Sequence, residues 1–218
     1  SVKVMLLQQK GKVIRPLAFN AEIFPRGLVI KDEIREPAKL SAIIRHTIDQ
    51  AKPHGFSNNY VIASLPESKS FIRLFDLPPM KQTELPAAVK WEAEQHIPLS
   101  IDQVEIDWKA LNPPEKTHRP SFWQKKAALR EQGWKIFMTA APKEVINPIV
   151  QVLKMAKLQP VALESESISI ARSCISPDLQ KQTVLLVDIG TNRTGLTIVN
   201  NNVINFTSSI SLAGLTIS

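Results

Sequence analysis

Residues 185–199 read LLVDIGTNRTGLTIV and decide the fold of this chain. The apolar run from Val184 to Val187 is typical of a short strand that is buried on both faces. Asp188 ends the run, and Gly190 allows a tight turn because it has no Cβ atom. An acid and a glycine therefore mark a turn at the end of a strand. The turn residues with hydroxyl or amide donors are Thr191, Asn192 and Thr194.

This turn has two interpretations. Side-chain donors beside free backbone N–H groups form a concavity that can bind a phosphate. The same residue types are also common in an ordinary β-hairpin turn. The organisation of the rest of the chain has to decide between them.

The composition is that of an ordinary globular protein. The chain has 218 residues, of which 44% are hydrophobic and 22% charged, enough for one large domain or two small ones. Its only cysteine, Cys174, excludes an internal disulfide framework and indicates a reducing compartment. We predict that Cys174 is a small core residue. No apolar stretch approaches the ~20 residues that span a bilayer, so attachment to a membrane would need a partner.

The net charge of +7 raises the possibility of a nucleic-acid partner. Much of the excess comes from residues 112–133, a basic segment that also contains Phe122 and Trp123. No sequence signature of a nucleic-acid-binding fold accompanies it, so we expect a solvated insertion and no nucleic-acid partner. The four histidines lack metal-ligand spacing, and no Walker A or dinucleotide-binding glycine motif occurs.

The two ends of the chain share a pattern. Strands are predicted at Ser1–Leu6 and Val13–Leu17, and again at Gly195–Val199 and Val203–Thr207. A repeat at this distance indicates two related lobes rather than a solenoid. After the first strand pair we predict a helix over 36–51 and a strand over 59–65. Pro66 then marks a boundary, because proline cannot donate to a sheet ladder.

The middle of the chain has a different order of elements. Residues 67–163 predict the order βαββαβ, which is that of a ferredoxin-like module inserted into a larger domain. Pro148 would kink the second helix of this module if the helix started at Pro142, and a start near Asn147 is the alternative. A helix over 166–175 is predicted to lead back to the first lobe. The six predicted elements of the module are a strand over 70–77, a helix over 83–96, strands over 103–111 and 134–140, a helix over 142–157 and a strand over 160–163.

Several motifs resemble one known family. The string Lys90-Trp91-Glu92-Ala93-Glu94-Gln95-His96-Ile97-Pro98 closely resembles the signature of the type IV pilus assembly protein family PilM. The resemblance covers nearly the whole chain and places it in the actin-like (ribonuclease H-like) ATPase superfamily, close to the division protein FtsA. Further matching motifs are Phe75-Asp76-Leu77-Pro78-Pro79-Met80, Asp107-Trp108, Ala140-Ala141-Pro142-Lys143-Glu144, Leu158-Gln159-Pro160, Glu166-Ser167 and Ala171-Arg172.

The resemblance implies a nucleotide site at the opening stretch. Proteins of this family bind ATP between two lobes, and Asp188 would face the Mg²⁺ ion or its waters. Arg193 replaces the small or polar residue usual in the family, and we expect it to point to solvent. The phosphates would be held by Asp188, Gly190, Thr191, Asn192 and Thr194.

The resemblance also implies that the chain is an internal fragment. The family's first phosphate hairpin would precede Ser1, and Ala213–Ser218 would open a helix of the second lobe. We therefore expect weak ATP binding and an apolar sheet over 184–207 without its covering helices. The implied parts are a first lobe over 1–66, an inserted subdomain over 67–163, a returning helix over 164–180 and the start of a second lobe over 181–218.

The implied function is that of a cytoplasmic adaptor of the type IV pilus machine, peripheral at the inner membrane. It would bind the N-terminal tail of a PilN-like membrane protein and couple the platform proteins to the assembly motors, with ATP as a conformational ligand. An FtsA-like division protein and the cytoplasmic domain of a type II secretion platform are the alternatives. A sugar-kinase-like phosphotransferase would need a carboxylate base, for which Asp107 and Glu92 are the nearest candidates. The sequence names no catalytic base, so we expect a scaffold rather than an enzyme.

The tail would lie in a groove beside the inserted subdomain. Trp91 is the preferred contact, because it lies off the apolar helix stripe set by Leu85, Val89 and Ala93. Core packing is the simpler interpretation of the other apolar residues near the groove. The candidate groove residues are Trp91, Leu85, Val89, Phe71 and Leu74.

Overall fold

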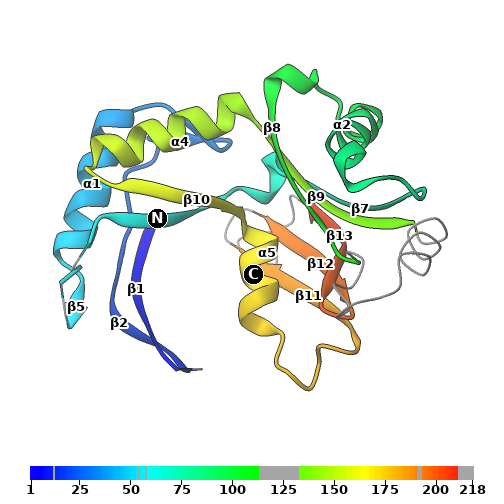
Figure 1. Ribbon diagram of the computed structural model, residues 1–218. Helices are drawn as coiled ribbons and strands as arrows, with labels where there is room; N and C mark the ends of the chain where they lie inside the picture. The colour runs from blue at the N-terminus through cyan, green and yellow to red at the C-terminus, as the bar shows by residue number, and fades with distance from the viewer. Residues whose placement is uncertain (12, 54, 57, 113–132, 191–192, 211–218) are drawn as a thin grey trace. The chain divides into compact units, whose positions relative to one another are not determined.

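The computed structural model describes residues 1–218 except 12, 54, 57, 113–132, 191–192 and 211–218 (Figure 1). The chain divides into two compact units, each built from two separate segments. Unit 1 contains residues 1–65 and 144–164, and unit 2 contains residues 66–143 and 165–218. The mixture of strands and helices confirms the predicted α/β class. None of the helices in the described part is long and apolar enough to span a membrane.

Unit 1 begins with the predicted strand pair. Strands β1 (Val2–Lys10) and β2 (Val13–Glu22) form an antiparallel hairpin, longer than the sequence predicts. A register shift between Leu6 and Leu7 interrupts the ladder. The short β5 (Lys52–Pro53) pairs with β2, and β3 (Val29–Ile30) pairs with β4 (Glu33–Ile34). Helix α1 (Pro37–Asp49) starts at a proline, which lacks only an N–H group that the first turn leaves unpaired.

The rest of unit 1 corrects the predicted module. Strand β10 (Gln159–Ser165) pairs with β6 (Tyr60–Leu65) and not with the sheet of the inserted subdomain. Helix α4 (Lys143–Met155), which precedes β10, packs its apolar face into the same core as α1. Burial of that face therefore places the last two elements of the expected βαββαβ unit in unit 1. The buried residues of this core are Ile48, Leu153, Ala156 and Leu158.

Helix α4 also corrects the expectation about Pro148. The helix begins at Lys143 and continues through Pro148. Proline at this position removes one intrahelical hydrogen bond. The buried Val152 and Leu153 lie after it in the same helix, so their packing holds the helix together across the proline.

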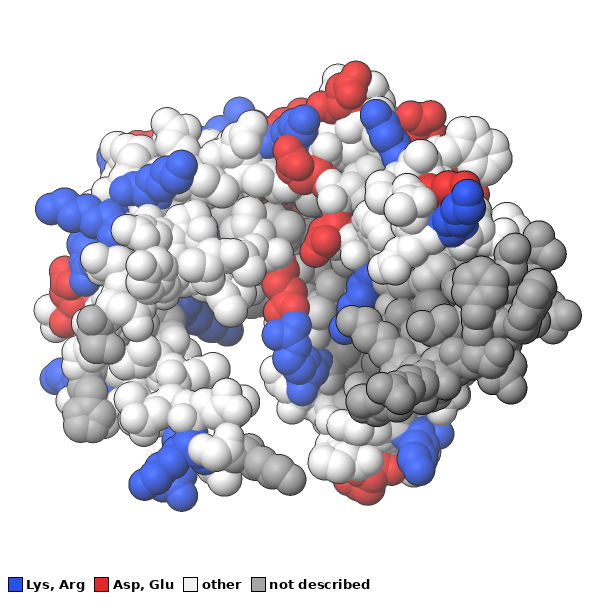
Figure 2. Space-filling view, in the orientation of Figure 1, with Lys and Arg blue, Asp and Glu red and all other residues white. Residues whose placement is uncertain are grey.

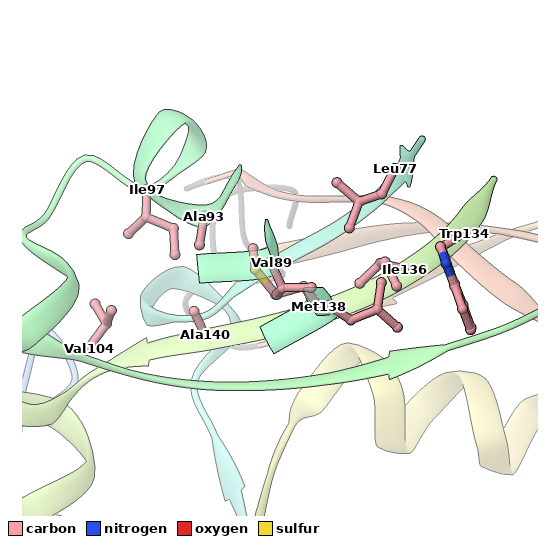
Figure 3. Close-up of a cluster of buried hydrophobic side chains, with 10 residues drawn as sticks. Leu77, Val89, Ala93, Ile97, Val104, Trp134, Ile136, Met138 and Ala140 are labelled. Atoms are coloured by element: carbon pink, nitrogen blue, oxygen red, sulfur yellow. The ribbon is translucent and has the colours of Figure 1, made fainter. Parts of the chain in front are cut away.

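Unit 2 contains a three-stranded sheet with one helix on its face. Strands β7 (Phe71–Leu77), β9 (Trp134–Pro142) and β8 (Val104–Ala110) are antiparallel in the order β7-β9-β8. Short helical turns η1 (Glu67–Lys69), η2 (Gln82–Glu84) and η3 (Ile101–Gln103) flank these elements. Helix α2 (Leu85–His96) covers the sheet, and Figure 3 shows its Val89 and Ala93 directed toward Met138 and Ala140 of β9.

The second part of unit 2 holds the opening stretch. Helix α5 (Glu166–Cys174) is followed by the antiparallel sheet β11 (Thr183–Ile189), β12 (Thr194–Asn200) and β13 (Val203–Ile210). Ala171 and Ile175 form one core with Val199 and Ile204. The helix predicted to return to the first lobe therefore belongs to unit 2.

The expected burial of β11 on both faces and the expected burial of Cys174 are wrong here, whereas the exposed apolar side chains agree with the expectation of an uncovered sheet. Leu185 and Val187 are more than half exposed, whereas Leu186 packs against the core of α5. Strand β11 is thus covered on one face only, because none of the described residues packs on the other face. Cys174, at the end of α5, is exposed and is not a core residue.

Candidate functional site

The turn between β11 and β12 closes tightly. Ile189 pairs with Thr194, and the backbone N–H of Gly190 donates to the carbonyl oxygen of Arg193 over 2.9 Å. A Cβ atom on residue 190 would lie 3.0 Å from that oxygen, so the tight closure favours glycine. The carboxylate of Asp188 is exposed, and Thr194 is buried. The other two predicted phosphate ligands, Thr191 and Asn192, lie outside the described residues.

A second carboxylate approaches the turn from η1. Gly195 faces Asp188 across the two strands, and a Cβ atom on residue 195 would lie 2.7 Å from Oε2 of Glu67. Glycine therefore makes room for the Glu67 carboxylate directly beside the strand. The backbone N–H of Glu67 donates to Oε2 of Glu166 over 3.5 Å, which brings the start of α5 to the same place.

Burial raises the pKa of Glu67, and the neighbouring charges act in both directions. The carboxylates of Glu166 and Asp188 raise this pKa further, while the Ser167 hydroxyl and the Arg193 guanidinium lower it. Oε1 of Glu67 is buried and has no hydrogen-bond partner among the described residues. Arg193 is half-buried, and its guanidinium is close enough to lower the pKa of Glu67. The expectation that Arg193 points to solvent is therefore wrong.

This site brings the acidic side chains of Glu67, Glu166 and Asp188 together beside the turn between β11 and β12. Carboxylates alone would repel a polyphosphate, but a hard divalent cation between them would reverse that repulsion. No three acidic, histidine or cysteine side chains in the described part are grouped as ligands of one metal ion. Asp188 and Glu166 are the exposed carboxylates of this site, which a cation with phosphate and water as further ligands could reach.

Glu67 lies in no sequence motif that marks it as a site residue. A signal existed in Gly195, because an isolated glycine inside a strand often marks the close approach of another group. The identity of that group depends on how η1 packs against β12, and no local pattern contains this information. Glu166 and Ser167 were noted only as motif residues.

The five candidate groove residues do not form one surface. Leu85 and Val89 are each 1% exposed and belong to the core beneath α2, and Phe71 packs against the same core. Leu74 is three positions after Phe71 in β7 and therefore lies on the opposite face of that strand. Trp91, by contrast, is 62% exposed on α2. It is the one candidate whose side chain is freely available to a partner.

The two candidate bases of a phosphotransferase are surface residues. Oε1 of Glu92 lies 3.0 Å from Nε2 of His96 on the same helix. Oδ1 of Asp107 accepts a hydrogen bond from the backbone N–H of Trp108. Neither carboxylate belongs to the turn at Asp188, so the geometry gives no support to this alternative.

Comparison with solved structures shows that two other proteins share the fold of this chain. The chain is similar to PilM in a PilM–PilN type IV pilus biogenesis complex, with a TM-score of 0.77 and 23% identity over 98% of this chain. It is also similar to the cytoplasmic domain of EpsL, an inner membrane component of the type II secretion system of Vibrio cholerae. That match has a TM-score of 0.54 and 10% identity, covering 96% of this chain and 66% of that one.

The sequence matches the family of type IV pilus assembly protein PilM over residues 1–217. The chain belongs to this family. It spans 59% of the length of the PilM chain in the solved complex.

Proposed function

We propose that this chain is part of a type IV pilus adaptor that binds the N-terminal tail of a PilN-like inner-membrane protein. The observation that carries the proposal is the family match over residues 1–217, together with the similarity to a PilM that was solved as a complex with PilN. In this role the protein lies on the cytoplasmic side of the inner membrane and is held there by its partner. It connects platform proteins to the assembly motors.

Trp91 is the residue that we assign to contact the tail. An indole is costly to leave in water, and an exposed aromatic residue often anchors a partner. Helix α2 is fixed to its sheet by the buried Leu85, Val89 and Ala93, so Trp91 is presented on a rigid support. Rigid support lowers the entropy lost on binding.

Calorimetric titration of the full-length protein with a PilN-tail peptide tests this proposal. Trp91→Ala should weaken binding about tenfold or more, as expected for an aromatic anchor. Phe206→Ala removes an exposed aromatic side chain on β13 and serves as the matched control. Unchanged affinity of Trp91→Ala removes Trp91 from the binding surface, and no binding by the unmodified protein contradicts the adaptor role itself.

We further propose that the Asp188 turn holds the phosphates of ATP with Mg²⁺ in the complete protein. Asp188 would face the ion or its waters, and Gly190, Thr191, Asn192 and Thr194 would face the phosphates. The bound ion supplies charge neutralisation between the phosphates and the carboxylates of Glu67, Glu166 and Asp188. In this proposal nucleotide acts as a conformational ligand that changes the equilibrium between states of the complete protein.

The dependence of nucleotide affinity on Mg²⁺ tests this assignment. Asp188→Asn in the full-length protein should weaken Mg²⁺-ATP binding, and it should not weaken the binding of metal-free ATP, because it removes a carboxylate that repels the phosphates. Asp178→Asn is the matched control, because Asp178 is an exposed acid in the loop that precedes β11. An equal loss with and without Mg²⁺ would show that Asp188 does not act through the ion.

A further inference from the structure

The closed end of the β1–β2 hairpin exposes large apolar side chains. Leu7 is 55% exposed, Val13 is 52% exposed and Ile14 is 63% exposed. Within unit 1, this end of the hairpin points away from α1 and α4 (Figure 1). Three apolar side chains at the tip of a projecting hairpin are unfavourable in water, so the tip is a candidate contact surface.

The hairpin ladder sorts these side chains by face. Directly paired residues lie on the same face, and the pairs Leu7 with Pro16 and Gln9 with Ile14 make one face mostly apolar. The intervening pairs, Gln8 with Arg15 and Lys10 with Val13, carry the basic residues on the other face. The tip therefore has an apolar side and a cationic side.

The charge around the tip has one sign. Residues 1–21 contain Lys3, Lys10, Lys12 and Arg15 and no aspartate or glutamate. Lys10 and Arg15 are both exposed. Figure 2 shows basic side chains at the tip of the hairpin with no acidic side chain beside them on the visible face.

We propose that the tip of the β1–β2 hairpin docks on the surface of an anionic phospholipid membrane. Leu7 and Ile14 on the apolar face would enter the interfacial layer, and Lys10 and Arg15 on the other face would contact the lipid phosphates. A lipid surface satisfies both faces at once, because apolar chains and anionic head groups lie within a few ångströms of each other. The apolar contact and the electrostatic attraction are each weak alone and act together here.

Docking of this kind goes beyond the proposed function, because it needs neither a PilN-like tail nor nucleotide. It would add a second, weak attachment to a protein that a partner already holds near the membrane. The effective concentration at the surface is then high, so a weak contact is sufficient to orient the protein.

Sedimentation with lipid vesicles tests the proposal. The protein should sediment with vesicles of phosphatidylglycerol and phosphatidylethanolamine and remain in solution with phosphatidylcholine vesicles. Lys10→Glu combined with Arg15→Glu should lower binding about tenfold or more, from the attraction of each cation to an anionic surface. The matched control, Lys109→Glu combined with Lys181→Glu, changes two exposed lysines elsewhere by the same net charge and should bind normally.

A second pair of variants tests the apolar face. Ile14→Ser should lower vesicle binding severalfold, whereas Ile23→Ser should not, although Ile23 is 89% exposed at the other end of β2. Circular dichroism spectra and melting curves confirm that each variant is folded. Equal loss in the tip and control variants would show that net charge alone causes binding, and no binding to anionic vesicles overturns the proposal.

Discussion

Oε2 of Glu67 lies so close to Gly195 that a Cβ atom on residue 195 would be only 2.7 Å from it. The contact joins the first residue of η1 to β12 inside unit 2. It places a carboxylate with a raised pKa next to the turn that carries Asp188.

Glu67→Gln should stabilise the protein at neutral pH. The pKa of Glu67 is raised above its ordinary value of 4.5, so the folded state binds the proton more tightly than the unfolded state. Its favourable contribution is complete below the unfolded pKa and is lost as the pH rises through the folded pKa. Glutamine stays neutral and avoids this loss, so we expect the melting temperature to rise by on the order of 1–2 °C at pH 7.5.

The gain from Glu67→Gln should shrink toward zero as the pH approaches 4, because the wild-type carboxyl is then protonated as well. Glu94→Gln is the control, since Glu94 is exposed on α2 and should give no pH-dependent difference. A difference between wild type and Glu67→Gln that is constant from pH 4 to pH 8 would contradict the raised pKa.

Gly195→Ala should destabilise unit 2 by about 1 kcal/mol or less, because the Glu67 carboxylate is the end of a flexible side chain that can shift. The new methyl group would displace the Glu67 carboxylate from its place beside β12. In a Glu67→Ala background the space is free, and most of the cost should disappear. Urea unfolding of the four proteins of this double-mutant cycle measures the coupling, and strict additivity would show that the two residues do not compete for space.

Val89→Ala should lower the free energy of unfolding, whereas Trp91→Ala should leave it nearly unchanged. Val89 is 1% exposed in the core under α2, so its truncation should cost about 2 kcal/mol of unfolding free energy. Trp91→Ala should change stability by less than about 0.5 kcal/mol, because the side chain is exposed. Urea titration checks both values, and a large loss of stability in Trp91→Ala would assign that residue a structural role.

Val187→Thr should slow aggregation of the 218-residue chain without lowering its unfolding midpoint. Val187 lies on the uncovered face of β11, and threonine keeps the β-branched shape while adding a hydroxyl. Leu186→Thr, one residue earlier, should lower the midpoint, because Leu186 packs against the core of α5. Light scattering during incubation and thermal melts separate the two effects; equal aggregation rates would show that the exposed face is not the source.

The sequence predicts most elements of this fold, because their patterns are local. The hairpin at Val13, the helix that starts at Pro37 and the strand pair around Gly190 all follow from residue spacing and turn residues. Membership of the PilM family follows from the resemblance of several motifs, and residue spacing alone does not contain it. Trp91 was correctly separated from the helix stripe of Val89 by its angular position, and its exposure confirms this.

The remaining features depend on contacts between distant segments. The pairing of β10 with β6 cannot be predicted from the order of elements, since the same order is compatible with a closed βαββαβ sheet. An apolar run such as Val184–Val187 does not distinguish a strand covered on two faces from one covered on a single face. Glu67 acquires its environment from β12 and α5, which lie far along the chain.

The division of unit 1 into two segments has a consequence for its synthesis. Ile48 packs with Leu153 and Leu158, and the whole β7-β9-β8 sheet is translated between the two sides of this core. The apolar faces of α1 and β6 therefore stay exposed until α4 and β10 have left the ribosome. The subdomain over residues 66–143 can fold during that interval, because its own sheet and α2 are continuous in sequence. Nascent chains that stop before Lys143 should therefore engage chaperones through the unfinished first segment rather than through the subdomain.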